Sequence, residues 1–180
     1  MELISLSDLA KEKVQTVQDY VLFCLQGVAN IFRKPLYLMD MVQQADTIGV
    51  GSLPIVVLTG FFTGAVLALQ ASNTLERFGS ITLVGQLVST SMVRELGPVL
   101  TSLMVAGRNS SGMASELGSM VVTEQIDAMR ALGTDPMKKL VTPRVVSTVF
   151  MLFFLTIISD LVGLVGGLAI AKLLLKLDAR

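Results

Sequence analysis

Residues 48–71 read IGVGSLPIVVLTGFFTGAVLALQA, and no charged residue occurs between Asp46 and Glu76. At a rise of about 1.5 Å per residue, this stretch forms roughly 36 Å of helix. That length is enough to cross a hydrocarbon core of about 30 Å. The stretch therefore predicts a first membrane span in an all-α, polytopic membrane protein.

Two further apolar stretches follow the first. Residues 78–106 are interrupted by Arg94, Glu95 and Pro98, and residues 145–171 are interrupted only by Asp160. Neither half of 78–106 spans a membrane alone, so the charged pair is expected inside or near the bilayer. The sequence thus predicts three spans, the second of which is kinked by Pro98 because proline lacks a backbone donor.

Small residues recur every four positions in the first span, at Gly60, Gly64 and Ala68. Small side chains at this spacing let two helix backbones approach closely, which predicts a helix-packing face. The alternative is that glycines are simply more common in membrane helices.

The composition excludes several classes of protein. The chain has 180 residues, of which 52% are hydrophobic and 16% charged, against about 25% charged in soluble domains. Its formal net charge is zero, so nothing points to nucleic acid. It has no histidine and one cysteine, Cys24, which excludes His- or Cys-based metal sites, internal disulfides and Ser–His or Cys–His catalysis. We expect no catalytic residue, metal or cofactor in this chain.

The N-terminal region has a different pattern and divides the chain into residues 1–47 and a membrane domain, 48–180. Its start carries three acidic residues and does not read as a cleavable signal. Residues 14–32 place apolar side chains at spacings of three and four, which predicts an amphipathic helix lying along the membrane surface, with Cys24 as a small apolar residue of it. The alternative is a fourth span. The apolar positions are Val14, Val17, Val21, Leu25, Val28 and Phe32.

Basic residues predict the orientation. The connection between the first two spans holds only Arg77, whereas the N-terminal part and the connection 109–143 are rich in Lys and Arg. We therefore expect the N-terminus and residues 109–143 to face the cytoplasm.

The connection 109–143 is polar but patterned like a helix. Thr123 is expected to cap a short helix that begins at Glu124, and Gly133 is expected to end it before a turn at residues 134–136. Its apolar side must be buried against the membrane surface or in a groove of a cytoplasmic protein. That side comprises Ile126, Met129, Ala131 and Leu132.

Charged residues in the spans usually face a partner or a wet cavity. Arg94 fits either an internal clamp with Asp160 or Glu95, or a site for an anionic phosphate headgroup. Glu116 is expected to pair with Arg108 near the cytoplasmic surface.

Residues 92–145, MVRELGPVLTSLMVAGRNSSGMASELGSMVVTEQIDAMRALGTDPMKKLVTPRV, resemble the signature region of the MlaE permeases, which are subunits of phospholipid ABC transporters. The resemblance extends over residues 48–167. In that family the EQIDAM helix docks on the ATPase, so the resemblance implies a coupling role for Glu124, Gln125, Ile126, Met129 and Leu132. No phosphate-binding loop occurs in this chain, so ATP would be bound by that partner.

The same resemblance implies a lipid-binding role for Arg94, Glu95 and Asp160 and for Leu75 and Phe78. It implies a homodimer in the bacterial inner membrane, with the first span at or near the dimer contact. The expected partners are an ABC ATPase, a periplasmic MCE-domain lipid carrier, a small STAS-type subunit and phospholipid. The family norm is five spans, so the last two are expected to be absent here. Rival hypotheses are a scaffold that anchors an ATPase and an intramembrane enzyme that uses Glu95 and Asp160.

Overall fold

The computed structural model describes residues 6–31 and 37–173, and helices make up nearly all of this part of the chain. No strand occurs within these two ranges. The predicted all-α class is therefore confirmed. In chain order the elements are α1 (Leu6–Ile31), α2 (Leu38–Arg77), a 3₁₀ turn η1 (Ile81–Leu83), α3 (Val84–Ser91), a π-helical turn η2 (Met92–Leu96), α4 (Gly97–Val122), α5 (Gln125–Ala131), a second π-helical turn η3 (Met137–Val141) and α6 (Thr142–Leu173).

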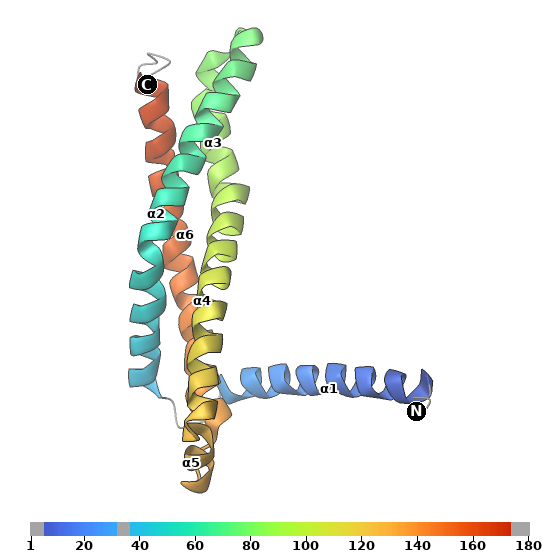
Figure 1. The fold of residues 1–180 in the computed structure, drawn as a ribbon. Coiled ribbons are helices and arrows are strands. Elements are labelled where there is room, and N and C mark those ends of the chain that lie inside the picture. The colour runs from blue at the N-terminus through green and yellow to red at the C-terminus, as the bar shows by residue number, and fades with distance from the viewer. Residues whose placement is uncertain (1–5, 32–36, 174–180) are drawn as a thin grey trace.

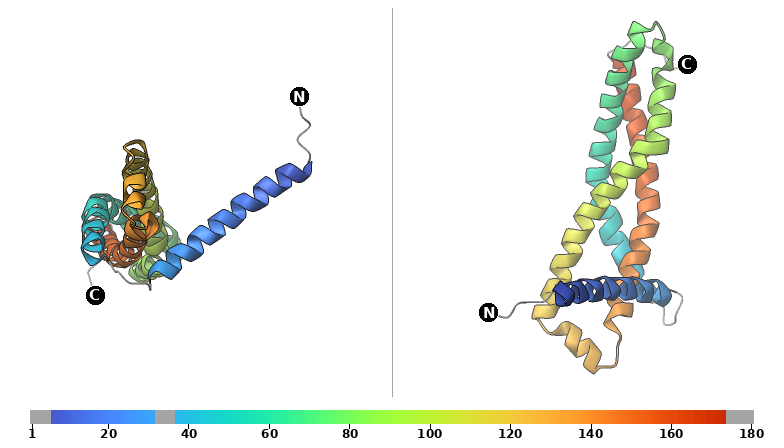
Figure 2. Two further views of the ribbon diagram at one scale, coloured as in Figure 1. Left: turned by 90° about the horizontal axis from the view of Figure 1, so that it is seen from below. Right: turned by 90° about the vertical axis from the view of Figure 1, so that its right-hand side faces the viewer.

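Helices α2, α4 and α6 run along one another as an elongated bundle, and α1 extends sideways from one end of it (Figures 1 and 2). We call this the α5 end, because α5 and η3 lie there too. The turn between α2 and α3 lies at the opposite end. The N-terminal helix and the connection 109–143 therefore meet at one end of the bundle, although which side of a membrane this end faces stays a prediction.

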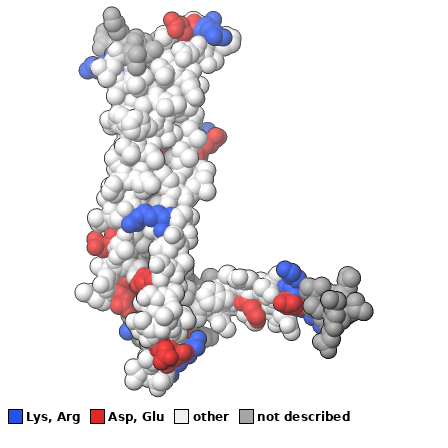
Figure 3. All heavy atoms as spheres, viewed as in Figure 1, with Lys and Arg blue, Asp and Glu red and all other residues white. Residues whose placement is uncertain are grey.

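Two helical segments are long and apolar enough to cross a membrane, residues 38–77 and 137–173. They contain the first and third expected spans, and α2 begins at Leu38, before the uncharged run. Their outer surfaces expose large apolar side chains, as expected of lipid-facing helices. Most of the visible face of the bundle is uncharged, and charged atoms lie at both ends and along α1, with one blue group midway and one red and blue group in the upper half (Figure 3). Exposed examples are Leu58, Phe62, Val66, Phe150, Phe153 and Leu161.

The second expected span differs from the prediction. Residues 84–122 form α3, a π turn and α4 in direct succession, so the helix continues well beyond residue 106. This segment is not among the two that meet the length and hydropathy criteria. The reason is composition: Arg94, Glu95 and Arg108, together with the serines and threonines around them, lower the mean hydropathy of this segment.

The small-residue face of α2 packs against α6 of the same chain. A side chain on Gly64 would run into the backbone of Gly163, and one on Gly166 would run into the carbonyl of Phe61. Gly60 lies against the backbone of Ser159, where an added Cβ would be 3.0 Å from the carbonyl oxygen. The two backbones thus approach closely along this contact, and Ala68 lies buried beside it.

The exposed side chains of α1 agree with a helix that lies outside the bundle. Val14, Val17, Val21 and Leu25 are all exposed, and α1 contacts the bundle at one end, at η3 and α6. It runs across the bundle rather than along it, which favours the surface-helix prediction over a fourth span. The side chain of Val28 and all of Phe32 lie outside the described part of the chain.

Candidate functional site

The charged pair lies on the π turn Met92–Leu96. The backbone N–H of Gly97 donates to the carbonyl of Met92, and the next residue, Pro98, has no N–H to offer the preceding turn. This arrangement widens the helix by one residue per turn, a feature often found at functional sites. Arg94 and Glu95 are exposed on its outer side. The π turn directly precedes Pro98, and the kink expected at Pro98 stays a prediction.

An apolar groove of about 330 Å³ adjoins this turn. A second groove, about 380 Å³, lies nearer the α2–α3 turn and includes the predicted Leu75. Phe78 lines neither and is 76% exposed. The first groove is lined by Phe62, Thr63, Val66, Leu67, Gln70 and Leu96, and the second by Leu75, Leu83, Gln86, Leu87, Thr90 and Ser91.

The predicted clamp between Arg94 and an acidic residue is not observed. Within residues 6–31 and 37–173, no ion pair joins Arg94 to Glu95 or to Asp160. Asp160 instead points its Oδ1 at Gly97, where even a methyl group would collide with it, and this oxygen has no hydrogen-bond partner in the described chain. Arg94 is thus left available to an external anion.

The helix α5 begins one residue later than predicted, and Thr123 does not cap it. Thr123 donates its hydroxyl to the carbonyl of Ser119 at 2.8 Å and so closes α4. Glu124 precedes α5 in a left-handed conformation, with φ of 56°. That conformation makes the change of direction between α4 and α5, and the chain returns to the bundle only after α5 (Figure 2).

The end of α5 follows the prediction. Gly133 adopts a φ of 74°, and the backbone N–H of Thr134 donates to the carbonyl of Met129, as in a glycine-terminated helix. Asp135 then accepts the N–H of Met137 at 3.0 Å and opens the next helical turn.

The predicted coupling residues divide into two groups. Ile126 faces inward and lines a cavity of about 340 Å³ with Phe23 of α1 and Leu117 of α4, and Met129 is half-buried. Glu124 and Gln125 are exposed, and Leu132 is 83% exposed. The helix is therefore held to its own chain by one side and presents the other side outward.

The expected pair between Arg108 and Glu116 is wrong. Glu116 pairs with Arg144, with 2.7 Å between Oε2 and Nη2, while Arg108 donates from Nη1 to Ser52 on α2 at 3.0 Å. Eight residues along one helix separate Arg108 from Glu116 by about 12 Å along its axis. Each side chain therefore finds a partner on a neighbouring helix instead.

The profile of the family described as Permease MlaE matches residues 41–180. The chain belongs to the MlaE permease family.

The curated relatives of this MlaE chain come from bacteria and a plant. A Rickettsia felis protein named "Probable ABC transporter permease protein" is 46% identical over 153 residues, which is 85% of this chain and 59% of that protein. The Haemophilus influenzae "Intermembrane phospholipid transport system permease protein MlaE" is 40% identical over 127 residues, covering 71% and 49%. An Arabidopsis thaliana protein, "TRIGALACTOSYLDIACYLGLYCEROL 1, chloroplastic", is 37% identical over 142 residues, covering 79% and 41%. The chain spans about 60% of the length of the first relatives it matches.

The ion pair between Glu116 and Arg144 is the feature of this MlaE chain that the sequence analysis missed. Arg144 directly follows Pro143 at the start of an apolar run, a place where a cation would be assigned to the membrane interface. The structure instead buries it, with 5% of the side chain exposed. The signal in the sequence was the distance between Glu116 and its expected partner Arg108, which lie about two turns apart on one helix, so that another cation had to be sought for Glu116.

Proposed function

We propose that this chain is a permease subunit of an ABC transporter that moves phospholipid between the inner membrane and a periplasmic MCE-type lipid carrier. A separate ATPase would supply the energy, and the chain itself would make and break no covalent bond. The observation that carries the proposal is the short helix α5, which projects from one end of a bundle of membrane-length helices and has one exposed side.

The exposed side of α5 supports docking of an ATPase. Glu124, Gln125 and Leu132 are free of contacts that would cover them within the described chain, whereas Ile126 anchors the helix to α1 and α4. A helix fixed on one side and exposed on the other suits insertion into a groove of a partner. Val122, which is also exposed, adds apolar surface at the start of the hairpin.

The π turn supports a lipid headgroup site. A guanidinium group matches the geometry of a phosphate oxygen pair, and Arg94 is exposed beside an apolar groove that ends at Leu96. Phosphate and acyl chain would thus find an Arg and an apolar surface within one turn of helix. Leu75, in the second groove, would extend the apolar path toward the α2–α3 turn.

The assembly follows from the family. Two copies would enclose a central cavity open to the periplasm, with the N-terminus and α5 in the cytoplasm and with the MCE protein and a small STAS-type subunit as further partners. ATP binding and hydrolysis would change the shape of this cavity through movement of whole helices. Since the small-residue face of α2 is occupied by α6, a dimer contact on α2 would use its other faces.

The intramembrane-enzyme hypothesis finds no support in the geometry. Glu95 is exposed, whereas the Oδ1 of Asp160 is enclosed against Gly97, so the two carboxylates face different surroundings. No group of three metal-ligating side chains occurs in the described ranges. The Arg94→Ala experiment described below distinguishes the scaffold hypothesis from lipid transport.

The coupling assignment is tested with Leu132→Ala. Its matched control is Leu173→Ala, a leucine that is 79% exposed at the opposite end of the bundle. Both proteins are purified from native membranes, and the co-purified ATPase is quantified. We expect Leu132→Ala to retain about tenfold less ATPase, as for an interface side chain contributing about 1.4 kcal/mol, and Leu173→Ala to retain the wild-type amount. Wild-type ATPase retention in a triple variant that also carries Glu124→Ala and Gln125→Ala would refute docking at α5.

The lipid assignment is tested with Arg94→Ala in the assembled complex, with Arg77→Ala at the end of α2 as the control. Phospholipid that co-purifies is measured by mass spectrometry, and transfer is measured with labelled vesicles. Loss of a hydrogen bond to a charged group, worth about 1.5–3 kcal/mol, predicts at least a tenfold loss of bound lipid for Arg94→Ala only. Unchanged lipid binding and transfer with the ATPase still attached would favour the scaffold.

A further inference from the structure

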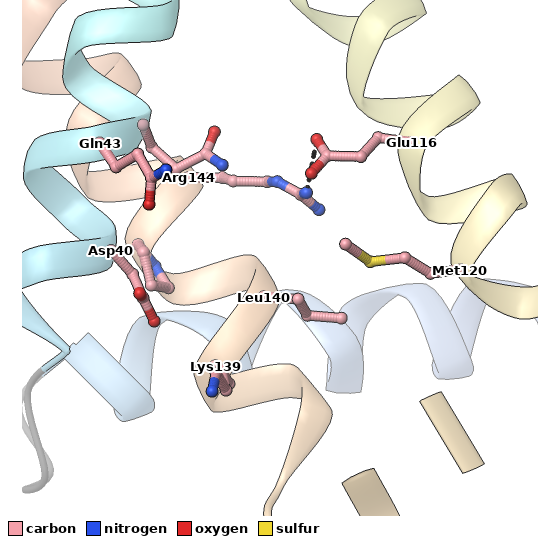
Figure 4. A pocket seen from close by; sticks show the side chains of 9 residues that line it. Asp40, Gln43, Glu116, Met120, Lys139, Leu140 and Arg144 are labelled. Carbon is pink, nitrogen blue, oxygen red and sulfur yellow. Dashed lines mark ion pairs between the residues drawn. The ribbon is translucent and has the colours of Figure 1, made fainter. Parts of the chain in front are cut away.

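Arg144 is a buried cation at the junction of three helices. It lies in the first turn of α6 with 5% of its side chain exposed, and it pairs with Glu116 of α4, which is 48% exposed. Gln43 of α2 lies beside it, and Asp40 and Lys139 line the same cavity (Figure 4). The ion pair therefore joins α4 to α6 next to α2.

This arginine is poorly satisfied. Only one of its guanidinium nitrogens takes part in the ion pair, and Nε and Nη1 are buried with no hydrogen-bond partner in the described chain. Burying a charge costs free energy that a single ion pair repays only in part, so an apolar side chain of similar volume would commonly stabilise such a position as well or better. Stability alone therefore does not explain an arginine here.

The helices around the pair are not tightly packed. A cavity of about 160 Å³ lies between α2, α4, η3 and α6 at this level, and Arg144 and Glu116 both line it. A further groove of about 330 Å³ between α2 and α4 also reaches Glu116. The ion pair thus bridges a space where apolar packing does not hold α4 against its neighbours, in contrast to the close backbone contact between α2 and α6.

The start of α6 is also tied to α2. Ser147, one turn after Arg144, is buried and donates its hydroxyl to the carbonyl of Met41 at 2.6 Å. The first turns of α6 are therefore joined to α2 by Ser147 and to α4 by Arg144. Both joints lie at the α5 end, where the hairpin of residues 123–141 connects the end of α4 to the start of α6.

We propose that the ion pair between Arg144 and Glu116 is a strut that makes α4, α6 and the α5 hairpin move as one body. This inference rests on the proposed function, because it concerns how a push on α5 reaches the bundle. With the strut in place, displacement of α5 turns α4 and α6 together. Without it, the cavity between the helices absorbs the displacement, and the bundle changes shape less. Arg144 and Glu116 are positioning residues in this scheme, since neither contacts lipid or ATP.

The test uses Glu116→Gln in the complete complex with its ATPase. The variant keeps the size of the side chain and removes its charge. Asp46→Asn is the matched control, since Asp46 is an exposed acid on α2 toward the same end and forms no ion pair in the described chain. Three quantities are measured for each protein: ATPase retained on purification, ATP hydrolysed, and labelled phospholipid transferred per ATP.

We expect Glu116→Gln to retain its ATPase and to hydrolyse ATP, while lipid transferred per ATP falls about tenfold, within the usual range of coupling between sites. Asp46→Asn should match the wild type. The exchanged double variant, Glu116→Arg with Arg144→Glu, should recover most of the lost transfer, which would show that the effect comes from the ion pair and not from either side chain alone. Arg144→Lys keeps the positive charge, so its lipid transfer per ATP should lie between that of Glu116→Gln and that of the wild type.

Two results would overturn the strut. One is a Glu116→Gln complex that transfers lipid per ATP as the wild type does. The other is a variant that loses ATPase binding, hydrolysis and transfer in equal proportion, which would show a role in folding or assembly only. A wild-type complex that binds an ATPase but transfers no phospholipid would instead refute the proposed function itself.

Discussion

Replacing Gly64 with alanine tests the contact that holds α2 against α6. The added Cβ would lie 2.8 Å from the Cα of Gly163 and closer still to its carbonyl group. All three atoms belong to the backbone, so no side chain can rotate away. Reaching an ordinary van der Waals separation of at least 3.4 Å requires the two helices to move apart at this level.

The size of the effect follows from two opposing terms. Overpacking of a tightly packed contact costs about 1–3 kcal/mol. Alanine in place of glycine within a helix returns about 0.5–1 kcal/mol, because it restricts the unfolded chain. The difference is a net loss of about 0–2.5 kcal/mol; its midpoint, about 1.25 kcal/mol, lowers the melting temperature of a chain of this size by roughly 2.5–5 °C.

The assay is thermal unfolding of the purified protein in detergent, compared with the same substitution at Gly107. An added Cβ on Gly107, within α4, meets no atom within 4 Å, so Gly107→Ala should gain stability by about 0.5–1 kcal/mol. The two variants should therefore shift the melting temperature in opposite directions. Equal shifts of the same sign would show that α2 and α6 do not meet at Gly64.

Two smaller perturbations test the α5 end of the bundle. Ser147→Ala should lower the free energy of unfolding by about 1 kcal/mol, because the hydrogen bond from the buried Ser147 hydroxyl to the carbonyl of Met41 is lost. Ser110→Ala, which removes an exposed bond within α4, should change the free energy of unfolding little, and equal effects of the two variants would contradict the joint between α6 and α2. Gly133→Ala should speed amide exchange in α5, since a φ of 74° costs alanine about 1 kcal/mol, while Gly118→Ala, in open space on α4, should slow or leave it unchanged.

The long helices could be predicted because their signals are local. The uncharged run 48–71 predicts a membrane-length helix, and the run 145–171, with Asp160 as its one charged residue, predicts another within α6. Gly133 ended α5 as expected, because only the backbone conformation of one residue is involved. Such features depend on neighbouring residues alone, and no knowledge of the tertiary structure is needed.

The predicted boundary between α4 and α5 was wrong because the hydroxyl of Thr123 has two possible local hydrogen bonds. A threonine hydroxyl can cap the helix that follows or bond back to the carbonyl four residues earlier. Here it donates to the carbonyl of Ser119, because α4 continues to Val122 and the chain changes direction at Glu124. The sequence holds both alternatives, and the length of α4 decides between them.

The prediction of the partner of Glu116 was wrong for a different reason, because this ion pair depends on contacts between segments that are distant in the sequence. Arg144 and Glu116 meet only after α5 and η3 have turned the chain back. The same holds for the small-residue face of α2, whose spacing predicted a close neighbour but could not say that the neighbour is α6 of the same chain. Spacing identifies a surface, whereas topology identifies what covers it.

The three helices of the bundle are joined by unlike kinds of contact, and this difference determines which of them can move. Helices α2 and α6 meet backbone to backbone, a contact that fits only one separation and register. At the α5 end, α4 lines cavities and is joined to α6 by the ion pair, while Arg108 further along α4 donates to Ser52 of α2. Toward the other end, α4 is preceded by the π turn that carries Arg94. A force on α5 therefore meets a rigid pair on one side and, on the other, a helix whose two irregular points are the ion pair and the charged turn. With α4 joined to α6 by the ion pair, a displacement of α5 would be taken up at the π turn, which would link the outward-facing side of α5 to the surroundings of Arg94 without disturbing the contact between α2 and α6.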